Sequence, residues 1–329
     1  MKQTQHKQRK ATQRSVIVWT QEAQQVQEAH RTSQIQDVVE QFLAAQDIRP
    51  RSKETYRKAL KQFTAYLVAN NIRTPRREDI LAYKQSLTGL YTACSISSYL
   101  TAVKALFTWL DSEGKYPNVA AGVKGAKHQQ GFRKDALTVD QARRILGTID
   151  RSTLEGKRDH ALVSLLIHTG LRTVEAARAD IGDLRQEGGE ALLNIQGKGR
   201  DEKDAFVVVT DGVLAAIRAY VKARGKIPEN APLFASASDR NPGGRLTTRS
   251  ISRIVKDAMR AAGIDSERLT AHSLRHSAVT FSLLGGASIQ EAQHMARHAN
   301  VNTTMIYAHN IDRIAKAAER RIDSLLGGV

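Results

Sequence analysis

Four side chains near the C-terminal end of the sequence are suited to chemistry on a phosphate group. Four candidates stand out within residues 270–309, namely His272, Arg275, His298 and Tyr307. The planar fork of an arginine binds two phosphate oxygens, and an imidazole can donate a hydrogen bond to a third. The ordinary pKa of tyrosine is about 10, so its hydroxyl attacks phosphorus only beside a proton acceptor and cationic groups. The set provides both, which makes Tyr307 the candidate nucleophile.

Helical spacing predicts how these side chains are positioned. His272 and Arg275 are three residues apart at the start of an apolar run, which places them on one face of a helix. The glycine pair at 285–286 ends that helix, and the S-x-x-E capping box at Ser288 starts a second helix that carries His298 near its end.

A second guanidinium is expected from the segment TGLRTVE, residues 169–175. Gly170 ends the apolar run ALVSLLIHT, so Arg172 comes directly after a helix stop. Each of these residues taken singly has an ordinary explanation, because helical histidines and arginines are usually solvated and tyrosines usually pack in a core. Their combination is harder to explain without a shared site.

Three motifs resemble those of the tyrosine recombinases, the integrase family that includes Cre and the Xer proteins. TGLRTVE is similar to the family's first arginine motif, HSLRH to its H-x-x-R motif, and ARHANVNTTMIYAH to its final motif, with the nine-residue spacing from histidine to tyrosine retained. The resemblance covers the C-terminal half densely and the preceding helical part loosely. The sequence departs from the family at Arg297, where glycine is usual, and at Val174, where serine is usual.

The resemblance implies strand exchange at specific DNA sites through a covalent 3′-phosphotyrosine. The catalytic residues that it implies are Arg172, Lys198, His272, Arg275, His298 and Tyr307. The arginines would hold the scissile phosphate, the histidines would donate a hydrogen bond and assist proton transfer, and Glu175 would orient the cluster. We expect no metal and no other cofactor, because fixed cations would stabilise the charge that Mg²⁺ stabilises in many phosphoryl transfers.

A change of hydrophobic period between residues 181 and 210 predicts a β-hairpin. Two short apolar runs, ALLNI and AFVVV, are separated by the polar QGKGRDEKD. Lys198 is near the expected tip, where the family carries a lysine that protonates the departing 5′ oxygen. Lys203 is an alternative, because the sequence does not locate the turn well.

The composition of the 329-residue chain indicates a polyanionic partner. The formal net charge is +17 and the pI is about 10.1, which favours nucleic acid because no basic amphipathic membrane anchor stands out. With Cys94 as its one cysteine, the chain has no intramolecular disulfide and no cysteine-based metal site. No apolar stretch approaches the roughly twenty residues of a membrane span. A cytoplasmic protein that acts on double-stranded DNA is therefore expected.

Apolar spacing in the N-terminal part predicts four helices that form one compact bundle. On the second helix, Lys53, Arg57 and Lys61 form a basic stripe beside the apolar face, which suits contact with DNA, although a solvated basic face is an equally ordinary explanation. We expect further contacts with DNA from Arg133, Lys134 and Arg249.

The expected fold class is mainly α with a small β-sheet, in which a helical bundle precedes an α+β catalytic domain opened by a capping box at Thr138. The expected segments are a flexible basic arm at 1–32, a DNA-binding bundle at 33–114, a linker at 115–136, a catalytic domain at 137–312 and a C-terminal helix at 313–329. The resemblance implies that this last helix docks on a neighbouring protomer of a homotetramer.

Other functions compete with this interpretation. A type IB topoisomerase would share the chemistry, a DNA-binding protein without catalysis would form no covalent product, and a metal-dependent nuclease would need a carboxylate cluster. Among recombinases, a mobile-element integrase and a Xer-like enzyme that resolves chromosome or plasmid dimers look alike in sequence. The basic arm and the high charge favour the former.

Overall fold

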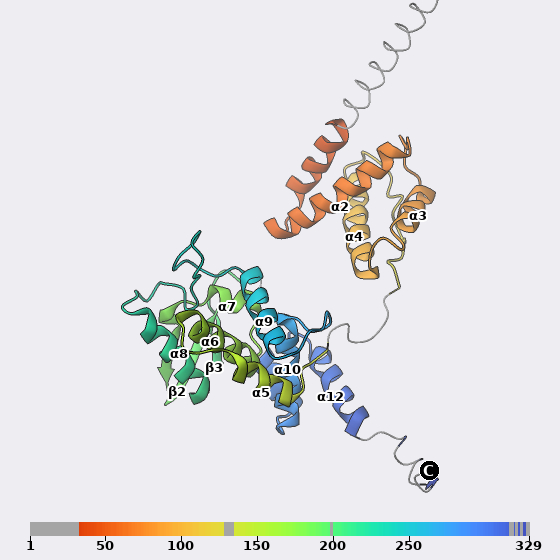
Figure 1. The fold of residues 1–329 in the computed structure, drawn as a ribbon. Coiled ribbons are helices and arrows are strands. Elements are labelled where there is room, and N and C mark those ends of the chain that lie inside the picture. Colours follow the sequence, from red (N-terminus) through yellow and green to blue (C-terminus); the bar gives the residue numbers. More distant parts are fainter. Residues whose placement is uncertain are drawn as a thin grey trace, which may run out of the picture. The chain divides into compact units, whose positions relative to one another are not determined.

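The computed structural model describes residues 33–127, 135–197 and 200–315, together with positions 319, 322, 325 and 326. The chain forms two compact units, Met1–Gln130 and Gly131–Val329 (Figure 1). The predicted arm, most of the predicted C-terminal helix, and the candidate residues Arg133, Lys134 and Lys198 lie outside the described residues. In the described part of the chain, no helix is long and apolar enough to cross a membrane.

The N-terminal unit contains the four predicted helices. They are residues 33–45, α2 (Pro50–Ala69), α3 (Arg77–Ser86) and α4 (Ala93–Ser112). Pro50 suits the first position of α2, where a missing N–H costs nothing, and the Thr92 hydroxyl caps α4 by accepting from the Ser95 N–H. The buried Phe63 ring lies 5.0 Å from Tyr83 and 6.1 Å from Phe107, so aromatic packing joins α2, α3 and α4.

The C-terminal unit is mainly helical. Its helices are α5 (Val139–Thr148), α6 (Leu154–Thr169), α7 (Thr173–Arg178), α8 (Asp211–Arg224), α9 (Thr248–Ala261), α10 (Ala271–Leu284), α11 (Ile289–Ala296) and α12 (Val301–Ala315). Helix α6 is the central element, because every side chain of the run 161–167 is buried. Helices α5, α7, α8, α9 and α10 pack against α6 (Figure 1).

A three-stranded antiparallel sheet completes the unit, in the order β1 (Leu184–Glu187), β2 (Glu190–Ile195), β3 (Ala205–Val208). The predicted hairpin is confirmed as β2 and β3, with Leu193 opposite Val207. The sequence reasoning missed β1, because its residues LRQE are mostly exposed and lack a strand pattern. The signal for it was the turn at 188–189, where two glycines have φ of 59° and 87°, as in the tightest hairpins.

Candidate active site

The end of α6 places the first arginine of the site. Gly170 ends the helix in the left-handed conformation, with φ of 61°, and a Cβ there would lie 3.3 Å from the Ala278 Cβ on α10. Glycine therefore allows both the turn and the close approach of α10. The chain then starts α7, and Arg172 becomes its N-cap residue, with a backbone N–H that donates to Glu175 Oε2 at 2.8 Å.

Glu175 is a fully buried carboxylate that binds two arginines. Its Oε1 accepts from Arg172 Nη1 at 2.7 Å, and its Oε2 accepts from Arg297 Nη2 at 3.0 Å. Burial alone would raise the pKa of Glu175, but the charge of Arg297 and the contacts with Arg172 outweigh it and lower the pKa. The carboxylate is therefore ionised at neutral pH and holds the two guanidiniums together.

Arg275 on α10 joins the ends of two helices. Its buried guanidinium donates from Nη1 to the Gly170 carbonyl at 2.6 Å and from Nη2 to the Ala296 carbonyl at the end of α11. Burial, with the neighbouring charge of Arg172, lowers the pKa of Arg275 to about 10. The group remains charged at neutral pH, and its position is fixed by backbone rather than by flexible side chains.

Tyr307 on α12 points its hydroxyl at a histidine that the sequence reasoning had not assigned. The hydroxyl is hydrogen bonded to His276 Nδ1, and the His276 ring lies 4.7 Å from the ring of His272. Burial raises the pKa of Tyr307 to about 12, so loss of its proton requires an acceptor at hand. The signal for His276 was its spacing, because it comes four residues after His272 on the same helix.

His298 follows α11, two residues after the helix ends, and packs against Tyr307. Its ring is stacked on the tyrosine ring at 6.4 Å with an interplanar angle of 12°, and its Nδ1 is hydrogen bonded to the buried Thr304 hydroxyl at 2.9 Å. Burial and then the charge of Arg275 lower the pKa of His298 to about 4. The imidazole is therefore neutral at pH 7 and can donate from one ring nitrogen.

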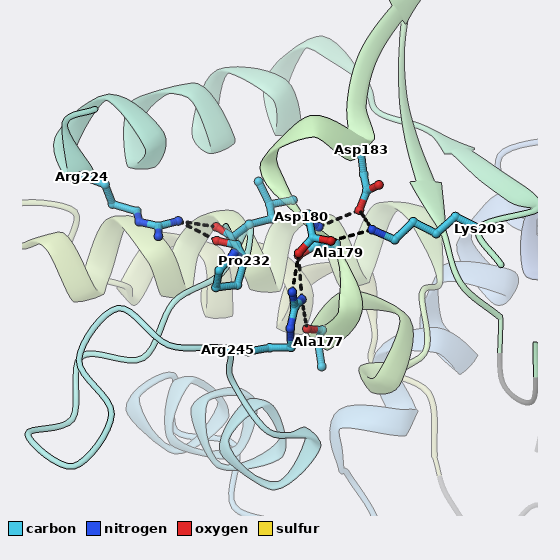
Figure 2. Close-up of polar contacts among 9 residues, drawn as sticks. Ala177, Ala179, Asp180, Asp183, Lys203, Arg224, Pro232 and Arg245 are labelled. Atoms are coloured by element: carbon cyan, nitrogen blue, oxygen red, sulfur yellow. Dashed lines mark hydrogen bonds and ion pairs between the residues drawn. The ribbon is translucent and has the colours of Figure 1, made fainter. Parts of the chain in front are cut away.

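Lys203, the alternative hairpin lysine, belongs to a separate ionic cluster (Figure 2). Its Nζ lies 2.7 Å from Asp180 Oδ2 and 2.6 Å from Asp183 Oδ2, and Arg245 binds Asp180 from the other side. Burial would lower the pKa of Lys203, but the bonds to the two aspartates outweigh it and raise the pKa. Lys203 thus anchors the strand that follows the β2–β3 loop, whereas Lys198 lies outside the described residues.

The predicted DNA-binding residues differ in their ion pairs and in their exposure to solvent. Arg57 is bound to Glu40 through two hydrogen bonds of 2.8 Å and to Glu54 through one of 3.1 Å. Its guanidinium is therefore paired with two carboxylates. Lys61 on α2 and Arg249 on α9 are exposed, and Lys53 is partly exposed.

Most of the predicted catalytic side chains meet in the C-terminal unit. The structure brings together Arg172, Glu175, Arg275, His298 and Tyr307, and His272 joins them through His276. It adds Arg297 and Thr304, which were not among the predicted site residues. Within the described ranges, no group of three or more histidine, cysteine, aspartate or glutamate residues is arranged to hold a metal ion.

Comparison with known proteins gives matches over both units. Residues 135–313 match the phage integrase family, and residues 35–114 match the phage integrase N-terminal SAM-like domain. A tyrosine recombinase of Synechocystis sp. is 30% identical over 294 residues, which are 84% of this chain and 91% of that protein.

Solved structures show a similar fold. The XerH site-specific recombinase bound to palindromic difH substrate aligns with a TM-score of 0.70 at 22% identity, over 88% of this chain and 85% of that chain. A lambda integrase tetramer bound to a Holliday junction aligns with a TM-score of 0.63 at 19% identity, over 84% of this chain and 76% of that chain.

Proposed function

The chain belongs to the phage integrase family and is a tyrosine recombinase, and we propose that it cleaves and rejoins DNA at specific sites through a covalent 3′-phosphotyrosine. The observation that carries this mechanism is the buried Tyr307 hydroxyl, which lies beside a histidine pair and within the field of the Arg275 guanidinium. Such a phenol is poorly acidic by itself and becomes a nucleophile when a phosphate and its cations complete the site.

Arg172 and Arg275 bind the non-bridging oxygens of the scissile phosphate in this mechanism. Glu175 orients the first of them, and the carbonyls of Gly170 and Ala296 orient the second. His298 donates a hydrogen bond to the same phosphate, with its ring held by Thr304. These fixed donors stabilise the charge that develops in the transition state, so no metal ion takes part in the proposed steps.

Proton transfer accompanies the displacement. The Tyr307 hydroxyl loses its proton to His276, which His272 supports through ring contact. The phenolate oxygen forms a bond to phosphorus while the bond from phosphorus to the 5′ oxygen breaks. Lys198 protonates that leaving oxygen, which gives a 5′ hydroxyl and a 3′-phosphotyrosine. A partner strand's 5′ hydroxyl reverses the step, because the tyrosyl ester keeps the phosphodiester energy.

We assign the general acid to Lys198 rather than to Lys203. An ammonium that binds two aspartates, with a raised pKa, is a poor proton donor, and Lys203 is held in this way. Lys198→Met should lower the single-turnover cleavage rate by roughly 10²- to 10⁴-fold. A substrate whose 5′ bridging oxygen is replaced by sulfur should restore cleavage by Lys198→Met, because a thiolate leaves without a proton. Failure of that rescue would move the acid to another residue.

The proposed partner is double-stranded DNA, in keeping with the net charge of +17. Residues 33–114 would bind the recombination site, 115–136 would follow the DNA as a linker, 137–312 would carry the chemistry, and 313–329 would dock on the next protomer of a homotetramer. The similar lambda integrase was solved as a tetramer on a Holliday junction, which supports this assembly. We place the protein in the cytoplasm, on DNA.

The biological role that we propose is integration or excision of a mobile element, on the strength of the basic N-terminal segment and the high charge. Resolution of chromosome or plasmid dimers by a Xer-like reaction is the alternative. The position of the recombination site separates the two roles. A mobile-element integrase acts at the ends of the element, whereas a Xer-like enzyme acts at a resolution site of the chromosome or plasmid.

The decisive experiment uses nicked duplexes with randomised arms, since the recombination site is unknown. A nick near the scissile phosphate lets the short strand diffuse away and traps the covalent product. Wild-type protein should retain DNA after denaturation in detergent, and the recovered strands define the site. Tyr307→Phe should bind the same DNA and form no adduct. An adduct retained by that variant would remove Tyr307 as nucleophile, and no adduct with wild type would remove the proposed mechanism.

A further inference from the structure

The backbone at Arg297 has a conformation that favours glycine. Among the described residues other than glycine, Arg297 and Asn71 are the two with positive φ, at 54° and 52°. Arg297 caps the C-terminal end of α11, and its backbone N–H donates to the His294 carbonyl at 3.0 Å. A left-handed residue ends the helix here, and glycine would adopt this conformation without steric cost. This chain has an arginine at the position despite that cost.

The Arg297 side chain turns inward instead of into solvent. It is 16% exposed, its Nη2 lies 3.0 Å from Glu175 Oε2, and its Nη1 donates to the Met295 carbonyl at 2.6 Å. The Nε atom is buried and has no hydrogen-bond partner in the structure. Burying a guanidinium is unfavourable unless a charge compensates it, so the bond to Glu175 is what makes this position tenable.

Arg297 completes the set of donors that fixes the Glu175 carboxylate. Oε2 accepts from both the Arg172 backbone N–H and Arg297 Nη2, which leaves Oε1 aligned with the Arg172 guanidinium. Without Arg297, Oε2 keeps only the bond from the Arg172 backbone N–H, so the carboxylate holds the Arg172 side chain less rigidly. The same bond ties the end of α11, directly before His298, to the start of α7.

We infer that Arg297 is a positioning residue for the recombinase: acting through Glu175, it holds the Arg172 guanidinium and the start of the His298 segment in the geometry that strand cleavage requires. This inference rests on the proposed function. Arg297 offsets the charge of Glu175, so the guanidiniums of Arg172 and Arg275 are the ones that face the phosphate.

The test compares three variants at one position. Arg297→Gly removes the side chain and relieves the backbone, Arg297→Gln keeps a long polar side chain without charge, and Arg297→Lys keeps the charge without the fork. Covalent adduct formation is measured in single turnover on the nicked duplex selected with wild-type protein. We expect Arg297→Gly and Arg297→Gln to lower the rate of adduct formation roughly 10- to 100-fold, which corresponds to the loss of a hydrogen bond to a charged group. Lys should restore a substantial part of the rate.

Two further measurements separate positioning from stability and from DNA binding. The melting temperature of Arg297→Gly should lie above that of Arg297→Gln, because glycine suits the left-handed backbone and offsets part of the lost ion pair. The affinity for DNA and its salt dependence should be unchanged in all three variants, since an arginine bound behind Glu175 releases no counterions from the duplex. A lower affinity with a shallower salt slope would show that Arg297 is an ordinary phosphate contact and would overturn the inference.

A double-mutant cycle with Glu175 tests the route of the effect. If Arg297 acts through the carboxylate, Arg297→Gln should lower the rate of adduct formation only slightly when Glu175 is already replaced by glutamine. Additive losses would overturn the inference, and so would wild-type rates in Arg297→Gly or a lysine variant no faster than the glutamine variant. In each of these outcomes, wild-type protein still forms the covalent adduct. If the proposed function itself is wrong, wild-type protein forms no adduct at all.

Discussion

Arginine pairs with carboxylate in both compact units, but the two clusters differ in their exposure to water. In the N-terminal unit, Arg57 and Glu40 form a bidentate pair with side chains 43% and 55% exposed. In the C-terminal unit, the Glu175 side chain is completely inaccessible to solvent and lies between Arg172 and Arg297. The same two functional groups therefore meet under opposite conditions of solvation.

The difference decides what each cluster can do. An exposed ion pair is screened by water and salt and contributes little to stability, so Arg57 can exchange its carboxylates for DNA phosphate at small cost. A buried pair loses its hydration, and removal of one member leaves an unpaired charge inside the protein. The exposed cluster suits reversible binding, and the buried cluster suits a fixed catalytic geometry.

Removal of the buried charge should have the largest effect. Glu175→Gln keeps the size of the side chain but leaves two guanidiniums without a counter-charge, so we expect about 3–5 kcal/mol of lost stability in the catalytic unit. Scanning calorimetry measures the loss. The matched variant Glu40→Gln should leave the unfolding transition unchanged within error. Equal effects of the two substitutions would break the comparison.

The Lys203 cluster lies between these extremes and should give an intermediate effect. The Lys203 and Asp183 side chains are 28% and 11% exposed. Lys203→Met should destabilise the catalytic unit by about 1–2 kcal/mol, because Asp183 loses its cation while Arg245 still binds Asp180. Covalent adduct formation should stay within a few-fold of wild type at a temperature where the variant is folded. A loss as large as that expected for Lys198→Met would return the acid role to Lys203.

Burial also predicts a pH dependence from His298. Its folded pKa of about 4 is below the ordinary value of 6.5, so the unfolded chain binds a proton that the folded chain does not. The folded state therefore keeps its full stability, as far as His298 is concerned, above about pH 6.5. As the pH falls towards 4, the free energy of unfolding decreases, because the unfolded chain takes up the proton first. The difference in melting temperature between wild type and His298→Gln, measured across this range, isolates this decrease. A constant difference would mean that the ring is solvated, in contrast to Glu175.

The smallest expected effect concerns DNA binding by the exposed cluster. Glu40→Gln removes a carboxylate that competes with phosphate for Arg57, so binding to a random duplex should tighten roughly two- to fivefold at low salt. Fluorescence anisotropy at several salt concentrations measures this change. Arg57→Gln should weaken binding and make the salt slope shallower by about one. Unchanged affinity in both variants would place this face of α2 away from DNA.

Local interactions account for what could be read from the sequence. The capping box at Thr138 is present as two reciprocal bonds with Gln141, of 2.9 and 3.1 Å, and the box at Ser288 starts α11 in the same way. Both depend on residues three apart, which the sequence shows directly. Strand β1 was missed because its pairing with β2, rather than its own residues, makes it a strand.

The family motifs predict the reacting groups but do not fix their partners. A motif cannot show that Arg297, 122 residues beyond Glu175, turns inward to share its carboxylate. Nor can it show that Tyr307 meets His276, or that Lys203 is held by Asp180 and Asp183. Each of these contacts depends on how separate helices and strands pack in the C-terminal unit.

The sequence by itself determined most of the helices, the β2–β3 hairpin, the basic charge and most of the side chains that gather around Tyr307, because capping, periodicity and motif spacing act over a few residues. Tertiary structure alone decided which charges are buried, which histidine contacts the tyrosine, and which lysine is already paired. Burial and partner distance set pKa values and the strength of ion pairs, and both arise only when elements distant in the chain are packed together.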